Sequence, residues 1–114
     1  MEHPELVTKL RKSGKDIVEQ LTNTQADALH MAVGIAGEAG ELLDAIKKYA
    51  IYQKNPDLEN IVEELGDLEF FMEGLRQIFC ITREECLDKN IAKLTKRYGE
   101  TYTNQAAQER KDKQ

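Results

Sequence analysis

Apolar residues recur at helical spacing along most of the chain, and no segment alternates apolar and polar residues as a strand would. Together with the turn signals between segments, this periodicity predicts four helices, over about residues 4–22, 28–52, 58–79 and 82–98. Thr24 with Asp27, and Thr82 with Glu85, resemble capping signals before the second and fourth helices. The pattern therefore predicts an all-α fold, a four-helix bundle with short connections.

The length of the chain and its apolar residues indicate how many domains and how many subunits to expect. The 114 residues predict a single domain over residues 1–99, followed by a polar C-terminal tail over residues 100–114. Four apolar residues of the second helix point to faces other than its acidic one: Ile35, Leu42, Leu43 and Ile46. Three short neighbouring helices would cover this surface poorly, so we expect a homo-oligomer.

Charge and hydropathy exclude several classes of function. A formal net charge of −5 argues against sequence-independent binding of nucleic acid, which relies on Lys and Arg to neutralise phosphates. The sequence contains neither an apolar run of membrane-spanning length nor a signal-peptide pattern, so we expect a cytoplasmic protein without a membrane partner. Cys80 and Cys86 match no metal or redox spacing and are expected to be reduced core residues.

Carboxylates occupy unusual positions on the second and third helices. On a helical projection, Glu64 falls inside the apolar arc of the third helix and Asp67 at its edge, while Glu38 and Glu41 share one face of the second. A buried carboxylate needs a cation or hydrogen-bond donors, and two acidic pairs facing each other repel. Four carboxylates form an all-oxygen site, which suits Mg²⁺ or Mn²⁺ rather than zinc.

Glycines accompany these acids in the segment GIAGEAGE, although each glycine costs a helix about 1 kcal/mol relative to alanine. Gly34 and Gly37 lie on or beside the acidic face and are expected to leave room for metal and substrate. Gly40 and Gly66 are expected to allow close backbone approach. The alternative interpretation is that small residues simply let the helices pack and that the acids are solvated.

The last helix supplies positive charge. Asn90, Lys93 and Arg97 line one flank of its apolar stripe, separate from Lys89 and Lys96, and would suit a polyphosphate. The alternative is a basic helix end that complements the helix dipole. His30 shares the face of Glu38 and Glu41 and either contacts the base or sugar of a nucleotide or is structural.

These acids lie in two motifs, Glu38-Ala-Gly-Glu41 and Glu64-Leu-Gly-Asp67, within the segments GEAGELLDAIKK and EELGDLEFF. With the later KNIAKLTKRYG, the chain resembles the MazG-like family of all-α nucleoside triphosphate pyrophosphohydrolases over about residues 25–99. The resemblance implies that the four acids coordinate Mg²⁺, and that the nucleotide is contacted by Lys89, Asn90, Lys93, Arg97 and Tyr98. It also implies a dimer or tetramer with sites near subunit interfaces. Gly37 stands where many members have a further acid, which leaves the number of metal ions open.

The expected function is therefore Mg²⁺-dependent hydrolysis of nucleoside triphosphates, deoxynucleotides in particular, to nucleoside monophosphate and pyrophosphate. This activity serves housekeeping of the nucleotide pool. The main alternative is a non-catalytic helical interaction module, an antitoxin-like or scaffold dimer, which Mg²⁺ should not stabilise. A di-iron carboxylate bundle needs Glu-x-x-His pairs, which neither His3 nor His30 completes.

Overall fold

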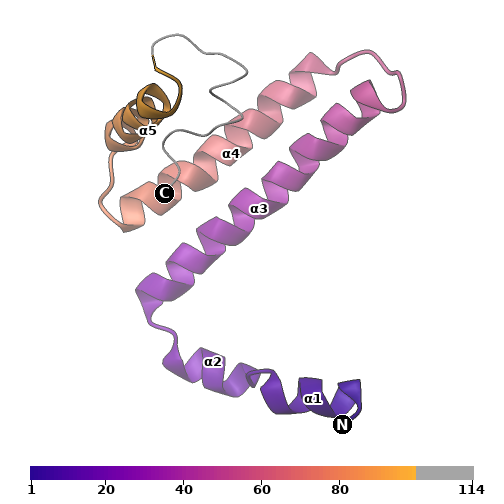
Figure 1. The fold of residues 1–114 in the computed structure, drawn as a ribbon, viewed down its shortest axis with the longest axis vertical. Coiled ribbons are helices and arrows are strands. Elements are labelled where there is room, and N and C mark those ends of the chain that lie inside the picture. The colour runs from indigo at the N-terminus through magenta and orange to yellow at the C-terminus, as the bar shows by residue number, and fades with distance from the viewer. Residues whose placement is uncertain (100–114) are drawn as a thin grey trace.

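The computed structural model describes residues 1–99, which form five helices and no strand. The helices are α1 (His3–Leu10), α2 (Gly14–Gln20), α3 (Asn23–Ala50), α4 (Leu58–Ile78) and α5 (Arg83–Tyr98) (Figure 1). The prediction of an all-α protein is confirmed. The predicted polar tail, residues 100–114, lies outside the described residues.

The N-terminal part differs from the single helix predicted over residues 4–22. It is divided into α1 and α2 by extended backbone at Arg11 and Ser13. The Ser13 hydroxyl accepts a hydrogen bond from the Asp16 amide at 3.1 Å, so Ser13 starts a new helix. A serine followed by glycine favours this cap over continuation of the helix, because both residues are poor in helix interiors.

Helix caps determine the starts of the longer helices. Thr22 and Gln25 form a capping box that begins α3, in place of the predicted signal at Thr24 and Asp27, so α3 starts earlier than expected. The predicted box of Thr82 and Glu85 is confirmed at the start of α5. α4 begins after Asp57, whose carboxylate accepts from the Asn60 amide at 3.1 Å.

Among residues 1–99, α3 and α4 are the only two helices that pack extensively together, as an antiparallel hairpin (Figure 1). Two glycines allow the close approach. A Cβ atom at Gly34 would overlap the ring of Phe71, and one at Gly74 would overlap the sulfur of Met31. Ala45 is buried further along the hairpin. Small residues on both helices therefore let the larger side chains of the opposite helix lie against the backbone.

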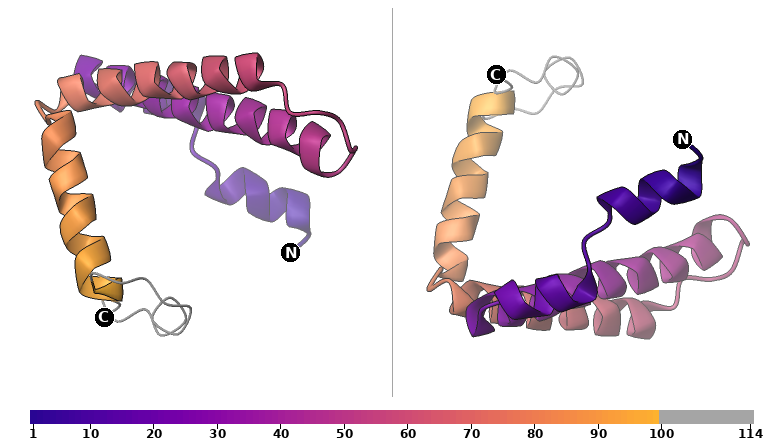
Figure 2. Two further views of the ribbon diagram at one scale, coloured as in Figure 1. Left: turned by 90° about the horizontal axis from the view of Figure 1, so that it is seen from above. Right: turned by 90° about the horizontal axis from the view of Figure 1, so that it is seen from below.

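An ordered turn joins α4 to α5. The carbonyl oxygen of Arg76 accepts from the Ile81 amide at 2.9 Å, and that of Gln77 accepts from the Cys80 amide at 3.2 Å, with Cys80 at φ 55°. The Arg76 guanidinium contacts Glu73 at 2.9 Å and Glu69 at 3.6 Å. Beyond this turn α5 leaves the hairpin on the same side as the segment α1–α2 (Figure 2).

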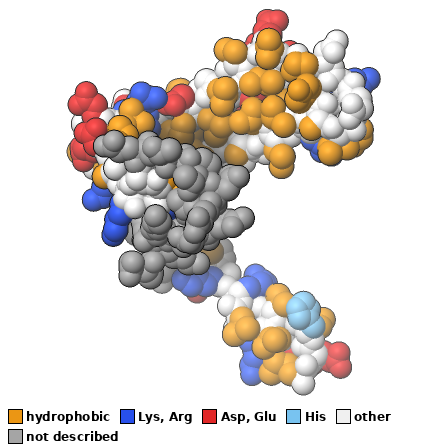
Figure 3. Space-filling model, turned by 45° about the horizontal axis from the view of Figure 1, so that its top comes forward, with side chains coloured by type: hydrophobic (Ala, Val, Ile, Leu, Met, Phe, Trp, Pro, Cys, Tyr) orange, Lys and Arg blue, Asp and Glu red, His pale blue; other side chains and the backbone are white. Residues whose placement is uncertain are grey.

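This arrangement leaves most apolar side chains accessible. Within residues 1–99 only Ala45 and Glu64 are buried, and each remains 9% exposed. The radius of gyration is 19.9 Å, whereas a compact chain of this length has about 13 Å. One chain thus does not close into the predicted four-helix bundle. Figure 3 shows hydrophobic side chains on the hairpin and on the N-terminal segment, and the exposed residues include Leu29, Val33, Leu43, Val62 and Phe70.

Two further expectations bear on the surface of the molecule. Cys80 and Cys86 are free thiols as predicted, but both are exposed, so the prediction that they belong to the core is wrong. Both lie at or just after the turn between α4 and α5. Within the described part of the chain, no helix combines the length and hydropathy of a membrane span.

Candidate metal and nucleotide site

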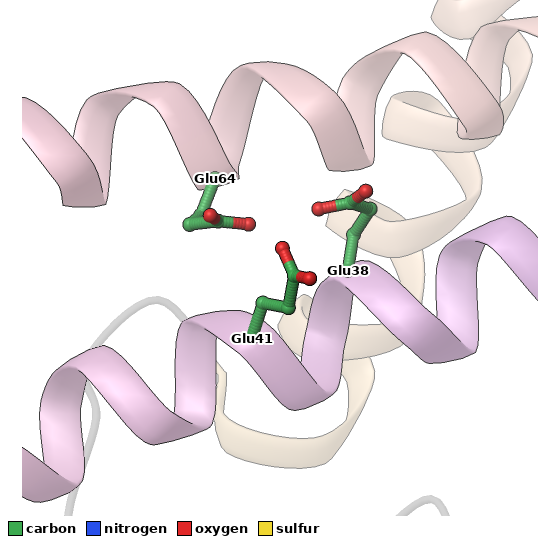
Figure 4. Close-up of side chains that lie close together, drawn as sticks. All are labelled: Glu38, Glu41 and Glu64. Carbon is green, nitrogen blue, oxygen red and sulfur yellow. The ribbon is translucent and has the colours of Figure 1, made fainter.

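Three glutamates from the helical hairpin converge. Glu38 and Glu41 extend from α3 and Glu64 extends from α4, and their carboxylates point toward one another (Figure 4). Each offers one oxygen, and these oxygens lie within 4.8 Å of one another. Glu64 is 9% exposed, Glu38 is half-buried and Glu41 is exposed. Glu38 and Glu41 stand one helical turn apart, so both reach the same point on α4.

One oxygen of each of two carboxylates lacks a partner. The Oε2 atoms of Glu38 and Glu64 are buried, and neither atom has a hydrogen-bond partner among the described residues. The pKa of Glu64 is raised to about 7, first because its carboxyl shares a hydrogen bond with Glu38, which requires a proton on one of the two. Burial and the negative charges of Glu41, Glu38 and Asp67 raise this pKa further.

This environment fits a hard cation. A cation of charge +2 would replace the shared proton, supply the missing partner for both buried oxygens and remove the repulsion among the three carboxylates. Oxygen-only ligands are the set that Mg²⁺ and Mn²⁺ prefer. The residues present therefore fit the metal that the sequence predicted.

The fourth predicted ligand, Asp67, is exposed and lies outside the group of three. Its charge nevertheless contributes to the raised pKa of Glu64, so it lies within electrostatic reach of that carboxyl. The sequence motifs thus identify three residues that the structure brings together and one that stands beside them.

The glycines around the cluster have separate roles. The expectation that Gly34 leaves room for metal or substrate is wrong, because the ring of Phe71 fills that space. A Cβ atom at Gly37 would meet no atom within 4 Å, so the space beside Glu38 is open as predicted. A Cβ atom at Gly40 or Gly66 would also meet no atom within 4 Å, so among residues 1–99 the predicted close backbone approach at these glycines is wrong.

Two residues of α4 with specific contacts were not singled out in the sequence. Phe71 lies against Gly34, and its ring centroid is 6.5 Å from that of His30. Arg76 is held by two glutamates at the end of α4. The sequence did contain a signal for Phe71. Gly34 lies one turn before Glu38 on α3, and Phe71 lies one turn after Asp67 on the facing helix. Nothing in the pattern marked Arg76.

Five of the six predicted nucleotide-binding residues lie on α5, apart from the glutamates, and the sixth, His30, lies on α3. Three of them, Lys89, Asn90 and Lys93, line one surface cavity together with Cys86, Ala92 and Lys96. The helical projection predicted that Lys89 and Lys96 lie apart from Lys93. In the structure all three side chains line the same cavity. The Arg97 guanidinium lies 5.7 Å from the centroid of the Tyr98 ring. Because α5 does not pack along the hairpin, these cations and the acids stay on separate parts of one chain (Figure 2).

Comparison with known proteins connects these features. Residues 26–101 match the family model of the MazG nucleotide pyrophosphohydrolase domain. The matched range holds the glutamate cluster, all of α4 and all of α5. No curated protein and no solved structure matches the chain.

Proposed function

The chain belongs to the MazG nucleotide pyrophosphohydrolase domain family, and on this premise we propose that it hydrolyses nucleoside triphosphates between the α and β phosphates. The products are a nucleoside monophosphate and pyrophosphate. The observation that carries the proposal is the cluster of Glu38, Glu41 and Glu64, whose buried oxygens lack donors. Deoxynucleotides are the proposed substrates, and control of the cytoplasmic nucleotide pool is the proposed role.

Mg²⁺ is the proposed cofactor, with Mn²⁺ as a substitute. Glu38, Glu41 and Glu64 would hold it. Asp67, whose charge acts on Glu64, would add a fourth carboxylate. When bound, the cation would neutralise negative charge on the phosphates and lower the pKa of a coordinated water. Glutamate oxygens that do not bind the cation accept a hydrogen bond from the attacking water and orient it toward phosphorus.

Cations on α5 complete the proposed site. Lys93 and Arg97 neutralise the leaving pyrophosphate, and Lys89, Asn90 and Tyr98 contact the nucleotide. These residues lie on a helix that does not pack along the hairpin of its own chain, which supports a site shared between subunits.

A homodimer or homotetramer is the proposed assembly. The radius of gyration of 19.9 Å and the exposed apolar residues of α3 and α4 support it, because a single chain leaves this surface in water. A second copy of the hairpin would cover that surface and complete a four-helix bundle around the acids.

Site variants test this function directly. Glu41→Gln and Glu64→Gln should each abolish Mg²⁺-dependent release of pyrophosphate while the helical circular dichroism spectrum is retained, since each change removes a charge from a repelling cluster. Glu63→Gln, an exposed neighbour of Glu64, is the matched control and should keep turnover within a few-fold of the parent. Full activity in either site variant would contradict the assignment. A non-catalytic module would release no pyrophosphate and gain no thermal stability from Mg²⁺.

A further inference from the structure

An ion-pair network joins α4 to the start of α5. Arg76 on α4 lies between Glu73, at 2.9 Å, and Glu69, at 3.6 Å. Arg83, the first residue of α5, lies 3.8 Å from the other carboxylate oxygen of Glu69. Glu73 is held in turn by the side-chain amide of Gln77, which donates to it at 3.0 Å. Two arginines and two glutamates thus connect the two helices across the turn.

Arg76 is the centre of this network. Its side chain is 13% exposed, whereas the other three side chains of the network are 47–58% exposed. Its main-chain carbonyl accepts a hydrogen bond from the Ile81 amide at 2.9 Å, within the turn. The pKa of Arg76 is raised, first by its hydrogen bond with Glu73 and, as a smaller cause, by the Cys86 thiol of α5. Arg76 therefore acts on α4, on the turn and on the first turn of α5.

The position of Arg83 is unfavourable within α5 itself. The first turn of a helix carries partial positive charge and favours acids, such as the neighbouring Glu84 and Glu85. A cation at the first helical position is repelled by the same charge. The ion pair with Glu69 of α4 offsets this repulsion, so the contact between the two helices explains a cation that local preference disfavours.

The direction of α5 matters because little else fixes it. Within the described part of the chain, α5 packs along no other helix, and it stands away from the hairpin (Figure 2). Lys93 follows Arg83 by about 15 Å along the helix axis. A tilt of about 20° at the turn would therefore move Lys93 by about 5 Å. Displacements of about 1 Å at a site already slow catalysis.

We propose that Glu69, Arg76 and Arg83 are positioning residues, which fix the direction of α5 and so place its nucleotide-binding residues. The inference deepens the proposed function and rests on it. On a helical projection Glu69 lies about 140° around α4 from Glu64, so the network faces away from the glutamate cluster. It acts on the substrate through α5 alone and leaves the metal site unchanged.

Kinetics of uncharged variants test the network. Glu69→Gln and Arg83→Gln should each raise the KM for nucleoside triphosphate about threefold, the range of one exposed ion pair, and leave the dissociation constant of Mg²⁺ unchanged. The double variant should be no worse than Glu69→Gln alone, because both changes remove the same ion pair. Arg83→Lys keeps the charge and should keep the KM of the parent. Glu63→Gln, an exposed acid of the same helix, is the matched control and should alter neither constant.

Thermal stability separates positioning from a purely structural role. Arg83→Gln removes a cation from the N-terminus of α5, so the Tm should stay the same or rise while the KM rises. An unchanged KM in Arg83→Gln would overturn the proposal. Multiplying effects of the two single changes in the double variant would also overturn it, because the residues would then act independently.

The direction of α5 is also measured without catalysis. In a protein with Cys80→Ser and Cys86→Ser, spin labels at Glu59→Cys on α4 and Thr95→Cys on α5 report the separation of two exposed positions. Excess unlabelled protein restricts the measurement to distances within one chain. Arg83→Gln should broaden the distribution of distances, whereas Arg83→Lys should not. Equal widths in the parent and in Arg83→Gln would overturn the proposal.

The two proposals can fail separately. If the parent protein hydrolyses no triphosphate, the proposed function is refuted, yet broader distances in Arg83→Gln would still support a network that directs α5. If the parent hydrolyses triphosphates while Arg83→Gln matches Glu63→Gln in KM, the function stands and the positioning role is refuted.

Discussion

Binding of Mg²⁺ should displace the proton that Glu38 and Glu64 share. The pKa of Glu64 is raised to about 7 by the hydrogen bond with Glu38, by burial and by the neighbouring carboxylates. A cation binds the ionised form, so protonation competes with the metal. The affinity for Mg²⁺ should therefore fall as the pH falls through 7, and bound metal should release a proton.

The magnitude follows from the pKa. With a pKa of about 7, the carboxyl is about nine-tenths protonated at pH 6 and about one-tenth protonated at pH 8. Metal binding should then release about 0.9 protons per chain at pH 6 and about 0.1 at pH 8. The dissociation constant of Mg²⁺ should be about tenfold higher at pH 6 than at pH 8.

Titration calorimetry in two buffers of different ionisation enthalpy measures these protons. Glu64→Gln is the control, since it removes the titrating carboxyl and should remove most of the pH dependence of the remaining weak binding. Release of fewer than about 0.3 protons at pH 6, with an affinity independent of pH, would show that the carboxyls are already ionised and that the reasoning is wrong.

The same proton affects the stability of the metal-free protein. The pKa of Glu64 rises on folding from 4.5 to about 7, so the folded state binds more protons between these values. The free energy of unfolding should therefore decrease as the pH rises from 4.5 to 7. Glu73, whose pKa is lowered by its hydrogen bonds to Gln77 and Arg76, acts in the opposite sense and only at lower pH. Thermal melting without metal at pH 5.5 and pH 8 checks the sign, and Glu64→Gln should flatten the difference.

Other variants test the glycines, the basic helix and the assembly. Gly37→Ala should stabilise the helix by about 1 kcal/mol, or raise the Tm by about 4 °C, yet lower turnover by filling the space beside the cluster. Gly34→Ala should destabilise by about 1–3 kcal/mol, because its methyl group overlaps an aromatic ring; equal Tm values for the two variants would refute this. Lys93→Ala should raise the KM and leave Mg²⁺ affinity unchanged, and Lys96→Ala, on the same cavity, tests whether the whole surface binds phosphate. Sedimentation at micromolar concentration should give at least twice the 13.0 kDa of one chain, and a pure monomer would contradict the shared site.

The helices could be predicted because their signals are local. Periodicity and the cap at Thr82 fix α5 to within a residue, and the turn before Asp57 separates α3 from α4. The division of the first predicted helix depends on one cap at Ser13, which competes with a periodic pattern that continues on both sides. Periodicity also says nothing about whether a helix packs within its own chain, which is why the four-helix bundle was expected from one chain.

The glutamate cluster could be predicted because helical phase alone brings Glu38, Glu41 and Glu64 together once two helices face each other. The role of Gly34 could not, since it depends on which side chain of α4 lies opposite. The offset between α3 and α4 is set by tertiary packing, and one residue of shift along α4 would place a different side chain over Gly34.

Because α3 and α4 alone pack extensively within the described part of one chain, the amide protons of the molecule should exchange with solvent very unevenly. Isolated helices as short as α1 and α2, of 8 and 7 residues, are marginal in water. At concentrations where copies associate, deuterium uptake in α1, α2 and α5 should be slow. On dilution it should accelerate in these three helices first, while the α3–α4 hairpin keeps its protection longer.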